Sequence, residues 1–409
     1  MTNKTRNYTH VTAAAALLGM SSTPLLGAGF QLAERSVSGL GRAFSGEAAI
    51  ADDASVIASN AAGMILLDDG ALSVGLQYIK PDVDVQGVHP NPLVGNISDT
   101  DIAEDALVPY FYYSRKINDN LSAGFGMYSS FGLATEYSRA FSSVVGSETS
   151  EITTVTLNPS LAYRLNDQWT IGAGIDVLYA EGRLTNYLGG NKFFDLEGDD
   201  WSIGWNFGVL FEVSDRTRIG LQYRSSIDLQ IEGTAEGILV GSTGAYKRDA
   251  SLSIELPDVA ELSIYHELND KWAIHSDVTW TGWSKFKTLA PKVHAGIDPL
   301  LAVQENWEDS YRYAIGATYK HSEKVTFRCG LAYDETPVSD ASRTLRIPDG
   351  DRIWASIGAT IKLNDCYNLD LAYTHLFADD TRIGPNEPAF TGTAGGDVDL
   401  VGIGISGTF

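Results

Sequence analysis

The sequence contains little cysteine, few cations and no long apolar segment beyond its N-terminus. After the first 30 of 409 residues, no apolar run approaches the roughly 18 residues that a spanning helix needs, which excludes a helical membrane protein. Lys and Arg number 29 against 52 Asp and Glu, and this deficit of cations argues against a nucleic-acid partner. The two cysteines, Cys329 and Cys366, form no CxxC pair or Cys/His cluster, so no metal or other cofactor is expected. Whether they pair as a disulfide stays open.

The first 27 residues are typical of a secretory signal peptide. Lys4 and Arg6 give a positive start, and residues 11–20 (VTAAAALLGM) form a short apolar core. Pro24 and the small residue Gly27 follow, where cleavage is expected. We therefore expect segment 1–27 to be removed and the protein to be exported.

Aromatic residues and glycines are abundant, and they occur in a period-two pattern through most of the chain. In residues 201–213 (WSIGWNFGVLFEV), bulky apolar side chains occupy one face, whereas the other face is mostly small or polar. The strands of a soluble β-sandwich also show this alternation. Small and polar residues opposite bulky apolar ones nevertheless favour a barrel with lipid outside and a polar lumen.

Six short polar turns set the number of strands. They fall at 118–119, 166–167, 214–215, 269–270, 322–323 and 364–365. Each interval holds two strands and a longer loop, which predicts an all-β fold, a 14-stranded antiparallel transmembrane β-barrel over residues 70–409. Apolar runs alone suggest 15 segments, but closure requires an even number, and we assign the two halves around Pro257 to one bent strand. Seven outer loops are expected near 87–105, 131–150, 185–200, 233–247, 283–307, 335–349 and 378–397.

The end of the chain indicates the compartment. Val401, Ile403 and Ile405 alternate in a last strand that stops on Phe409, and this pattern resembles the insertion signal of Gram-negative outer-membrane barrels. We therefore expect the cell outer membrane, with lipopolysaccharide and outer-membrane lipid as partners. The acidic run 195–200 (DLEGDD) is expected to be a solvated loop face; a divalent cation bridging it to lipopolysaccharide is the alternative.

Residues 28–69 do not alternate and are rich in Gly and Ala. Because a 14-stranded barrel would otherwise leave a sizeable pore, we predict that this segment is an N-terminal hatch inside it. A disordered periplasmic tail is the alternative, although the apolar residues of the segment favour burial. The candidate hatch and ligand-contacting residues are Phe30, Leu32, Leu40, Phe44 and Asn60.

Residues 28–53 (AGFQLAERSVSGLGRAFSGEAAIADD) resemble the mature N-terminus of the FadL-type outer-membrane transporters of long-chain fatty acids and other hydrophobic compounds. The resemblance continues through 131–137 (FGLATEY), 272–275 (WAIH) and 347–354 (IPDGDRIW). It implies a monomeric barrel closed by a hatch, and passive uptake of a hydrophobic ligand. The ligand would be caught among the outer loops, bound in a pocket above the hatch, and released sideways into the membrane.

In this family the lateral opening lies where the third strand kinks inward. The matching position is Gly132, and its neighbours Phe131 and Leu133 are candidates for lining the opening. A glycine there is physically reasonable because it weakens strand pairing and permits a bulge. The alternative is an ordinary strand end that leads into a loop.

Two departures from the family pattern affect the expected site. The Asn-Pro-Ala motif of the hatch reads NAA at 60–62, and the Arg and Lys that hold a carboxylate in the family align with Asn186 and Glu308. Arg183 and Arg312 lie close in sequence, but Arg183 should point to the opposite face of the strand from Asn186, at the surface. Long-chain fatty acids are the expected ligands from the family resemblance, whereas the missing cations favour the alternative, uncharged aromatic hydrocarbons or alkanes.

Two other classes of function compete with transport of hydrophobic compounds. An outer-membrane enzyme would need a nucleophile with a base, yet no GxSxG elbow is present and the histidines lie in no catalytic motif, so we expect no enzyme. A general porin would keep an open lumen, whereas residues 28–69 are expected to fill it.

Overall fold

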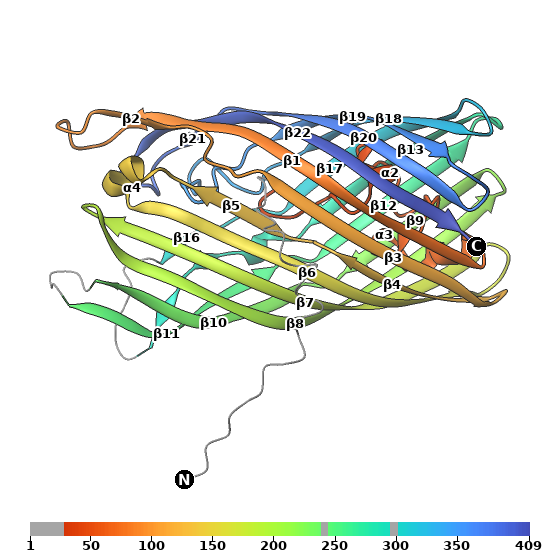
Figure 1. Cartoon of the computed structure of the whole chain (residues 1–409), viewed down its shortest axis with the longest axis horizontal. Coiled ribbons are helices and arrows are strands. Elements are labelled where there is room, and N and C mark those ends of the chain that lie inside the picture. The colour runs from red at the N-terminus through yellow and green to blue at the C-terminus, as the bar shows by residue number, and fades with distance from the viewer. Residues whose placement is uncertain (1–27, 239–243, 295–301) are drawn as a thin grey trace, which may run out of the picture.

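The computed structural model describes residues 28–238, 244–294 and 302–409. The expected signal peptide, 1–27, lies outside the described residues. A closed antiparallel barrel dominates the fold (Figure 1). The short turns and the C-terminus lie at its right end in that view, and the loop elements β2 and α4 at its left end. No helix among the described residues has the length and apolar character needed to cross a membrane.

The barrel has 14 strands, as predicted, and several of them consist of two consecutive elements. In chain order they are β1 (Gly70–Val88), β3 (Ala106–Asn118), β4 with β5 (Leu121–Tyr128, Gly132–Glu136), β6 (Ser147–Arg164), β7 (Trp169–Leu188), β8 (Asn191–Ser214), β9 with β10 (Thr217–Arg224, Ile227–Ile238), β11 with β12 (Ala245–Leu256, Val259–Glu267), β13 (Trp272–Thr281), β17 (Ser310–Lys320), β18 (Val325–Asp334), β19 (Arg352–Lys362), β20 with β21 (Tyr367–Ala378, Thr381–Ile383) and β22 (Thr391–Thr408). The sheet closes where β1 pairs with β22, from Ala71 opposite Thr408 to Val88 opposite Thr391.

The remaining elements belong to the loop end. They are β2 (Asn96–Asp99), α4 (Arg139–Val145), η2 (Trp283–Lys285), β14 (Thr288–Leu289), β15 (Lys292–Val293) and β16 (Val303–Gln304).

Asparagine side chains shape the short turns at the opposite end. The Oδ1 atoms of Asn166, Asn269 and Asn364 each accept two backbone N–H groups, at 2.9–3.1 Å, from the residues two and three positions later. These local bonds replace ladder hydrogen bonds and reverse the chain tightly. Pro257 falls between β11 and β12, which form one interrupted strand as expected. Cys329 and Cys366 are both exposed and unpaired.

Four of the predicted loops, 131–150, 185–200, 233–247 and 378–397, were too long, because the strands extend into them. Residues 185–200 are not a loop: β7 and β8 pair as far as Leu188 opposite Asn191, and the acidic run 195–200 lies in β8. Likewise, β10 and β11 cover most of 233–247. Exposed polar side chains weaken the period-two hydrophobic signal there, although Phe194 and Leu196 of β8 are buried and the backbone ladder continues.

Along the strands of the wall, apolar side chains that face outward alternate with small or polar side chains that face the lumen. On β8, Trp201 and Ile203 are 58% and 72% exposed toward the outside, while inward-facing Asn206 is 5% exposed. Over most of their length the strands are paired with two neighbours, so the backbone polar groups of these parts of the wall need no water, as a bilayer requires.

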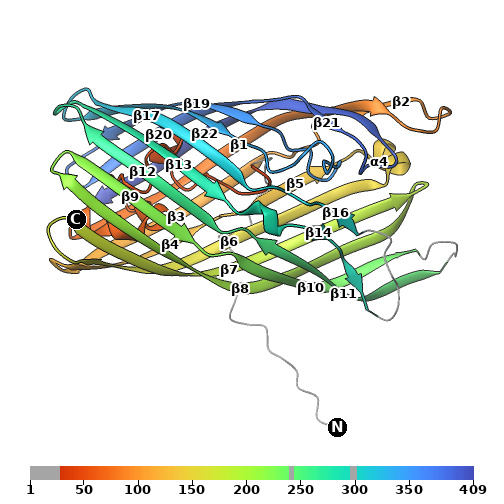
Figure 2. The ribbon, with the colours of Figure 1, turned by 180° about the vertical axis from the view of Figure 1, so that it is seen from behind.

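Residues 28–69 lie inside the barrel, where Figure 2 shows their helices and loops enclosed by strands. The segment contains α2 (Val37–Leu40), α3 (Val56–Ser59) and η1 (Ala61–Leu66). Glycines of the wall make room for it: a Cβ on Gly220 would overlap the Ala48 carbonyl group, and a Cβ on Gly172 the backbone of Ala62. The buried apolar side chains form one cluster around this segment and a second one toward the loop end.

Candidate functional site

The third strand of the barrel is interrupted, and the N-terminal residues fill the interruption. Between β4 and β5, Ser130 accepts a backbone hydrogen bond from Leu32 (2.9 Å), and the Gly132 N–H donates to Phe30 (2.9 Å). Gln31 forms an isolated antiparallel bridge with Phe131. The expected kink thus coincides with a break in the strand, and the segment 30–32 supplies the missing partner for the backbone there.

The side chain of Phe30 is held in an aromatic cluster. It is 2% exposed, and its ring centroid lies 4.6 Å from that of Trp283, 5.6 Å from Phe286, 5.7 Å from Trp307 and 6.1 Å from Phe131. The pairs with Trp283 and Phe286 are edge-on, and such aromatic pairs add to the stabilisation from burying the rings. Trp283, Phe286 and Trp307 come from the loop between β13 and β17, so this loop folds into the barrel to hold the N-terminal segment.

Gly29 attaches the same segment to another outer loop. Its N–H donates to Asp349 Oδ2 at 3.0 Å, and burial raises the pKa of Asp349 to about 6. Gly29 has φ +65°, and a Cβ there would overlap Trp307, so the position suits only glycine. The segment 347–354 therefore fixes the start of the hatch.

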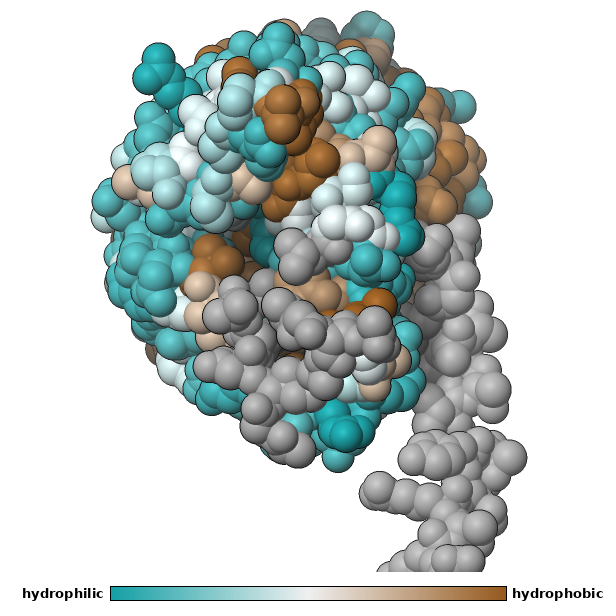
Figure 3. Space-filling model, turned by 90° about the vertical axis from the view of Figure 1, so that its left-hand side faces the viewer, coloured by the Kyte–Doolittle hydropathy of each residue, from teal (hydrophilic) through white to brown (hydrophobic). Residues whose placement is uncertain are grey.

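An apolar pocket lies directly above Phe30. Its cavity is about 40 Å³, and Phe30 closes its hatch side. The apolar lining comes from β5, β6, β7, β11 and the outer loops: Leu133, Ile152, Leu184, Leu252, Ile254, Phe286, Leu289 and Ile347. Figure 3 shows the loop end, where hydrophobic side chains border a central hollow within a mostly hydrophilic rim.

Arg346 provides a buried cation at the polar side of this pocket. Its guanidinium donates to Ser150 Oγ (2.8 Å) and to the side-chain oxygen of Asn186, and it lies 3.4 Å from the Thr185 carbonyl oxygen. Among the described residues, no carboxylate lies within ion-pair distance of it. Burial lowers the pKa of Arg346, which reflects the cost of this charge in an apolar setting.

Two carboxylates act on Arg346 electrostatically: Glu305, which is buried, and Glu387, which is half-buried. Burial raises the pKa of Glu305 to about 7, although Trp307 and Arg346 both oppose the shift. Burial also raises the pKa of Glu387. Neither glutamate contacts Arg346, so the guanidinium retains much of its positive potential toward the pocket.

The structure places the other aligned positions differently. Glu308 is exposed and does not line the pocket. Arg183 forms an ion pair with Asp195 at 3.1 Å and is 42% exposed, but it also borders the pocket from β7. Arg312 lies deeper, where it donates to the Ala43 carbonyl group of the hatch. Sequence reasoning missed Arg346, although it immediately precedes the 347–354 motif.

Leu32, Leu40, Phe44 and Asn60 lie away from the pocket, on the hatch side. Leu32 and Phe44 line a separate cavity of mixed polar and apolar lining between hatch and wall. Leu40 and Phe44 belong to the hatch cluster, and Phe44 packs edge-on against Trp354 with centroids 6.1 Å apart. Of the predicted hatch residues, only Phe30 joins Phe131 and Leu133 in the loop-side cluster.

Asn60 fastens the hatch to the wall without the proline of the family motif. Its Nδ2 donates to the Ala48 and Val209 carbonyl oxygens, at 2.7 and 3.1 Å, and its Oδ1 caps the N–H of Ala62. The contact is therefore with β8, and not with the break in the third strand.

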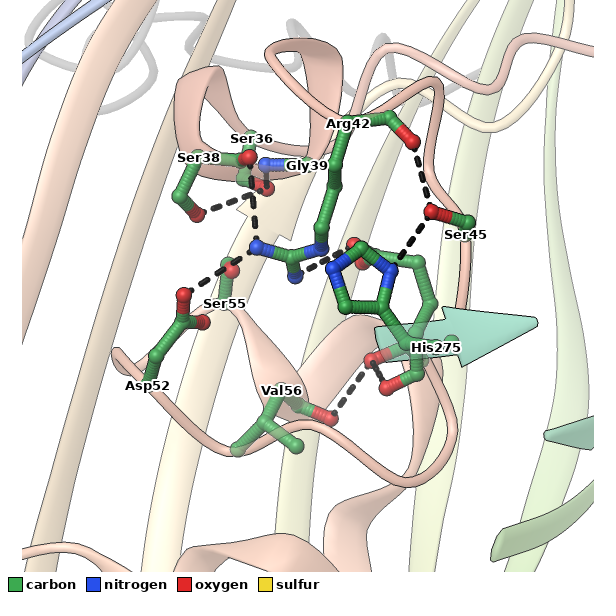
Figure 4. Close-up of polar contacts among 12 residues, drawn as sticks. Ser36, Ser38, Gly39, Arg42, Ser45, Asp52, Ser55, Val56 and His275 are labelled. Carbon is green, nitrogen blue, oxygen red and sulfur yellow. Dashed lines mark hydrogen bonds and ion pairs between the residues drawn. The ribbon is translucent and has the colours of Figure 1, made fainter. Parts of the chain in front are cut away.

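A buried charged cluster holds the rest of the hatch (Figure 4). Arg42 pairs with Glu47 at 2.6 Å and with Asp52 at 3.1 Å, and Asp52 reaches Arg328 of β18 at 3.0 Å. Burial alone would raise the pKa of Asp52, but the two arginines lower it below its usual range. Ser45 contacts His275 of β13 at 2.7 Å. These contacts attach the hatch segment around Arg42 to strands β13 and β18 of the wall.

Together these features define a class: an outer-membrane channel whose lumen is filled by its own N-terminal segment, beneath an apolar pocket. The sequence model of the family described as outer membrane protein transport protein (OMPP1/FadL/TodX) matches residues 18–409. The chain belongs to this family, and it is an outer-membrane protein. The family consists of transport channels.

Relatives and solved structures agree with this assignment. The chain is 34% identical to the long-chain fatty acid transport protein of Escherichia coli O6:H1, over 92% of this chain and 93% of that one. It is also 34% identical to the 47 kDa outer membrane protein of Pasteurella multocida, over 99% and 100%. A crystal structure of a Pseudomonas aeruginosa FadL homologue superposes with a TM-score of 0.85 at 21% identity, covering 93% and 99% of the two chains, which supports the fold.

Proposed function

We propose that this protein is a passive channel that takes up hydrophobic compounds across the outer membrane, with long-chain fatty acids as its main ligands. The observation that carries the proposal is Arg346, a buried cation without a carboxylate partner among the described residues, beside an apolar pocket. An acyl chain gains about 0.8 kcal/mol for each methylene buried, and a carboxylate gains charge-assisted hydrogen bonds from the guanidinium. The names of the fatty acid transport relatives support this choice of ligand.

The route follows from the position of Phe30. A ligand in the pocket lies against Phe30, whose backbone occupies the gap at 130–132. Withdrawal of the segment 29–32 would leave Phe131, Gly132 and Leu133 around an open break in the wall, facing lipid. Movement from an apolar pocket into lipid needs no energy source, so the protein acts by facilitated diffusion and not as an enzyme.

The aromatic lining favours a second class of ligand. Phe30, Phe286 and the neighbouring tryptophans would also accommodate uncharged aromatic hydrocarbons, and a solved toluene transporter from Ralstonia pickettii shares the fold, with a TM-score of 0.71. We further propose that the protein works as a monomer, since pocket and break lie within one closed barrel. Lipopolysaccharide and membrane lipid would surround its apolar belt.

The test compares oleate and toluene in cells that lack their own transporters. Arg346→Gln removes the charge and keeps a side chain that can bond Asn186. Because hydrogen bonds to charged groups are worth about 1.5–3 kcal/mol, the half-saturation concentration for oleate should rise about 10- to 150-fold. Uptake of toluene should not change. The control is Arg382→Gln, which removes an exposed arginine of β21.

Saturable oleate uptake that is unaffected by Arg346→Gln would remove Arg346 as the head-group cation. If the wild-type protein in the outer membrane takes up toluene but no oleate, the ligand class is the uncharged aromatic one.

A further inference from the structure

A seam in the barrel wall separates β11 from the loop that follows β13. β11 pairs with β10 along its whole length, but on its other side only Ala250 and Ser251 pair with β15. Pairing of the same strand resumes at Val259, with β13. Within the described part of the chain, residues 252–256 therefore have no strand partner on that side.

The loop leaves this edge because it turns inward. The Lys287 carbonyl oxygen accepts from Glu305 (2.9 Å) and Asn306 (3.1 Å), and the Phe286 carbonyl oxygen accepts from Trp307 (3.3 Å). The backbone bonds that could have extended the wall are thus made within the loop. The inward turn is the one that places Phe286 and Trp307 against Phe30.

A surface hollow of about 310 Å³ lies over the seam. Its rim is polar, and its floor contains Leu229, Ile254 and Phe286, which are 0%, 8% and 3% exposed. Ile254 and Phe286 also line the apolar pocket above the hatch. One layer of apolar side chains therefore separates the hollow from the pocket.

The seam lies at the outer boundary of the apolar belt. Just below it, Tyr223 donates to Asp258 at 2.8 Å, and Trp280 donates to Asp309 at 3.1 Å, an arrangement typical of aromatic residues at a membrane interface. Unpaired backbone is tolerated at this level because water and lipid head groups can satisfy it, whereas in the hydrocarbon region it is not.

Two lysines mark the mouth of the hollow. Lys285 is engaged by Asp258 at 3.0 Å and by Ser226 at 3.3 Å. Lys287 is exposed, and among the described residues its ammonium group has no ion pair. It offers a cation to an anionic head group that arrives along the membrane surface.

We propose that this seam is a second side opening, through which a fatty acid passes from the outer leaflet into the pocket. Its carboxylate rests on Lys287 while its acyl chain passes between Ile254 and Phe286. The opening would be an inlet, distinct from the break at 130–132 through which the ligand leaves. This inference rests on the proposed function, because it takes the same ligand to the same pocket.

The experiment measures labelled oleate uptake at subsaturating concentration, with the amount of each variant in the outer membrane determined in parallel. Lys287→Glu should lower uptake about two- to tenfold through lost attraction and new repulsion. Ser253→Trp, which fills the hollow from β11, should lower it as well. The controls are Lys320→Glu and Ser322→Trp at the short-turn end, and toluene serves as a ligand that Lys287→Glu should not affect.

Each outcome separates the two proposals. Wild-type uptake with both hollow variants equal to wild type overturns the inlet and leaves the proposed function intact. Absence of oleate uptake by the wild type overturns both. If Lys287→Glu instead reduces the lipopolysaccharide that copurifies with the protein and leaves oleate uptake unchanged, Lys287 binds a lipid phosphate and the inlet is refuted.

Discussion

Replacing Phe30 with alanine tests whether its ring keeps the N-terminal segment in the gap of the wall. The ring is 2% exposed and has four aromatic neighbours, so its removal should cost about 3–5 kcal/mol, the usual range for a buried Phe→Ala change. Since each 1.36 kcal/mol is a factor of ten, the equilibrium for detaching residues 29–32 should shift by about 10² to 10⁴.

Hydrogen exchange of the purified protein reports this detachment directly. The Gly132 N–H donates to Phe30 and the Leu32 N–H donates to Ser130, so both amides lose their acceptors when the segment leaves. Their protection in Phe30→Ala should fall by at least about a hundredfold, and wild-type protection should largely return in Phe30→Leu.

Phe44→Ala is the matched control for this prediction. It also removes a buried ring, which is 4% exposed and packs edge-on against Trp354, but this ring lies in the hatch cluster. Protection at Gly132 and Leu32 should stay at its wild-type level there. Equal losses in both variants, or no loss in Phe30→Ala, would refute a local anchoring role for Phe30.

The barrel could be predicted from the sequence because its determinants are local. Alternation and turn asparagines such as Asn166 and Asn269 act over a few residues, and evenly spaced turns leave little freedom in the strand count. The outer hairpins were predicted poorly for the opposite reason. At the loop end of β7 and β8, charged residues such as Asp195 and Glu197 interrupt the apolar pattern, and the signal that shows a strand is weakened although Phe194 is buried there.

The site depends on contacts between residues far apart in the sequence, and such contacts leave little trace in a local sequence pattern. Arg346 lies 160 positions from Asn186, and no spacing rule joins a loop arginine to that strand. Trp283 and Trp307 lie in the predicted loop 283–307, and they meet Phe30 because this loop folds inward. The sequence did indicate that Asn186, the aligned position, lacks a cation. In the structure, Arg346 reaches this asparagine from another loop.

Two further predictions concern the attachment of the hatch and the charge of the pocket. Asn60→Ala leaves the Ala48 and Val209 carbonyl oxygens without their side-chain donor, and a lower temperature of barrel unfolding is expected, from a loss of about 1–3 kcal/mol; an unchanged midpoint would contradict it. Because the pKa of Glu305 is raised to about 7, this group is ionised at pH 8 and neutral at pH 6, so the positive potential of Arg346 is less offset at the lower pH. Decanoate should therefore half-saturate the purified protein at a lower concentration at pH 6 than at pH 8, since its binding favours the protonated glutamate. Glu305→Gln should remove this dependence, and a variant that keeps the wild-type pH profile would show that another group titrates.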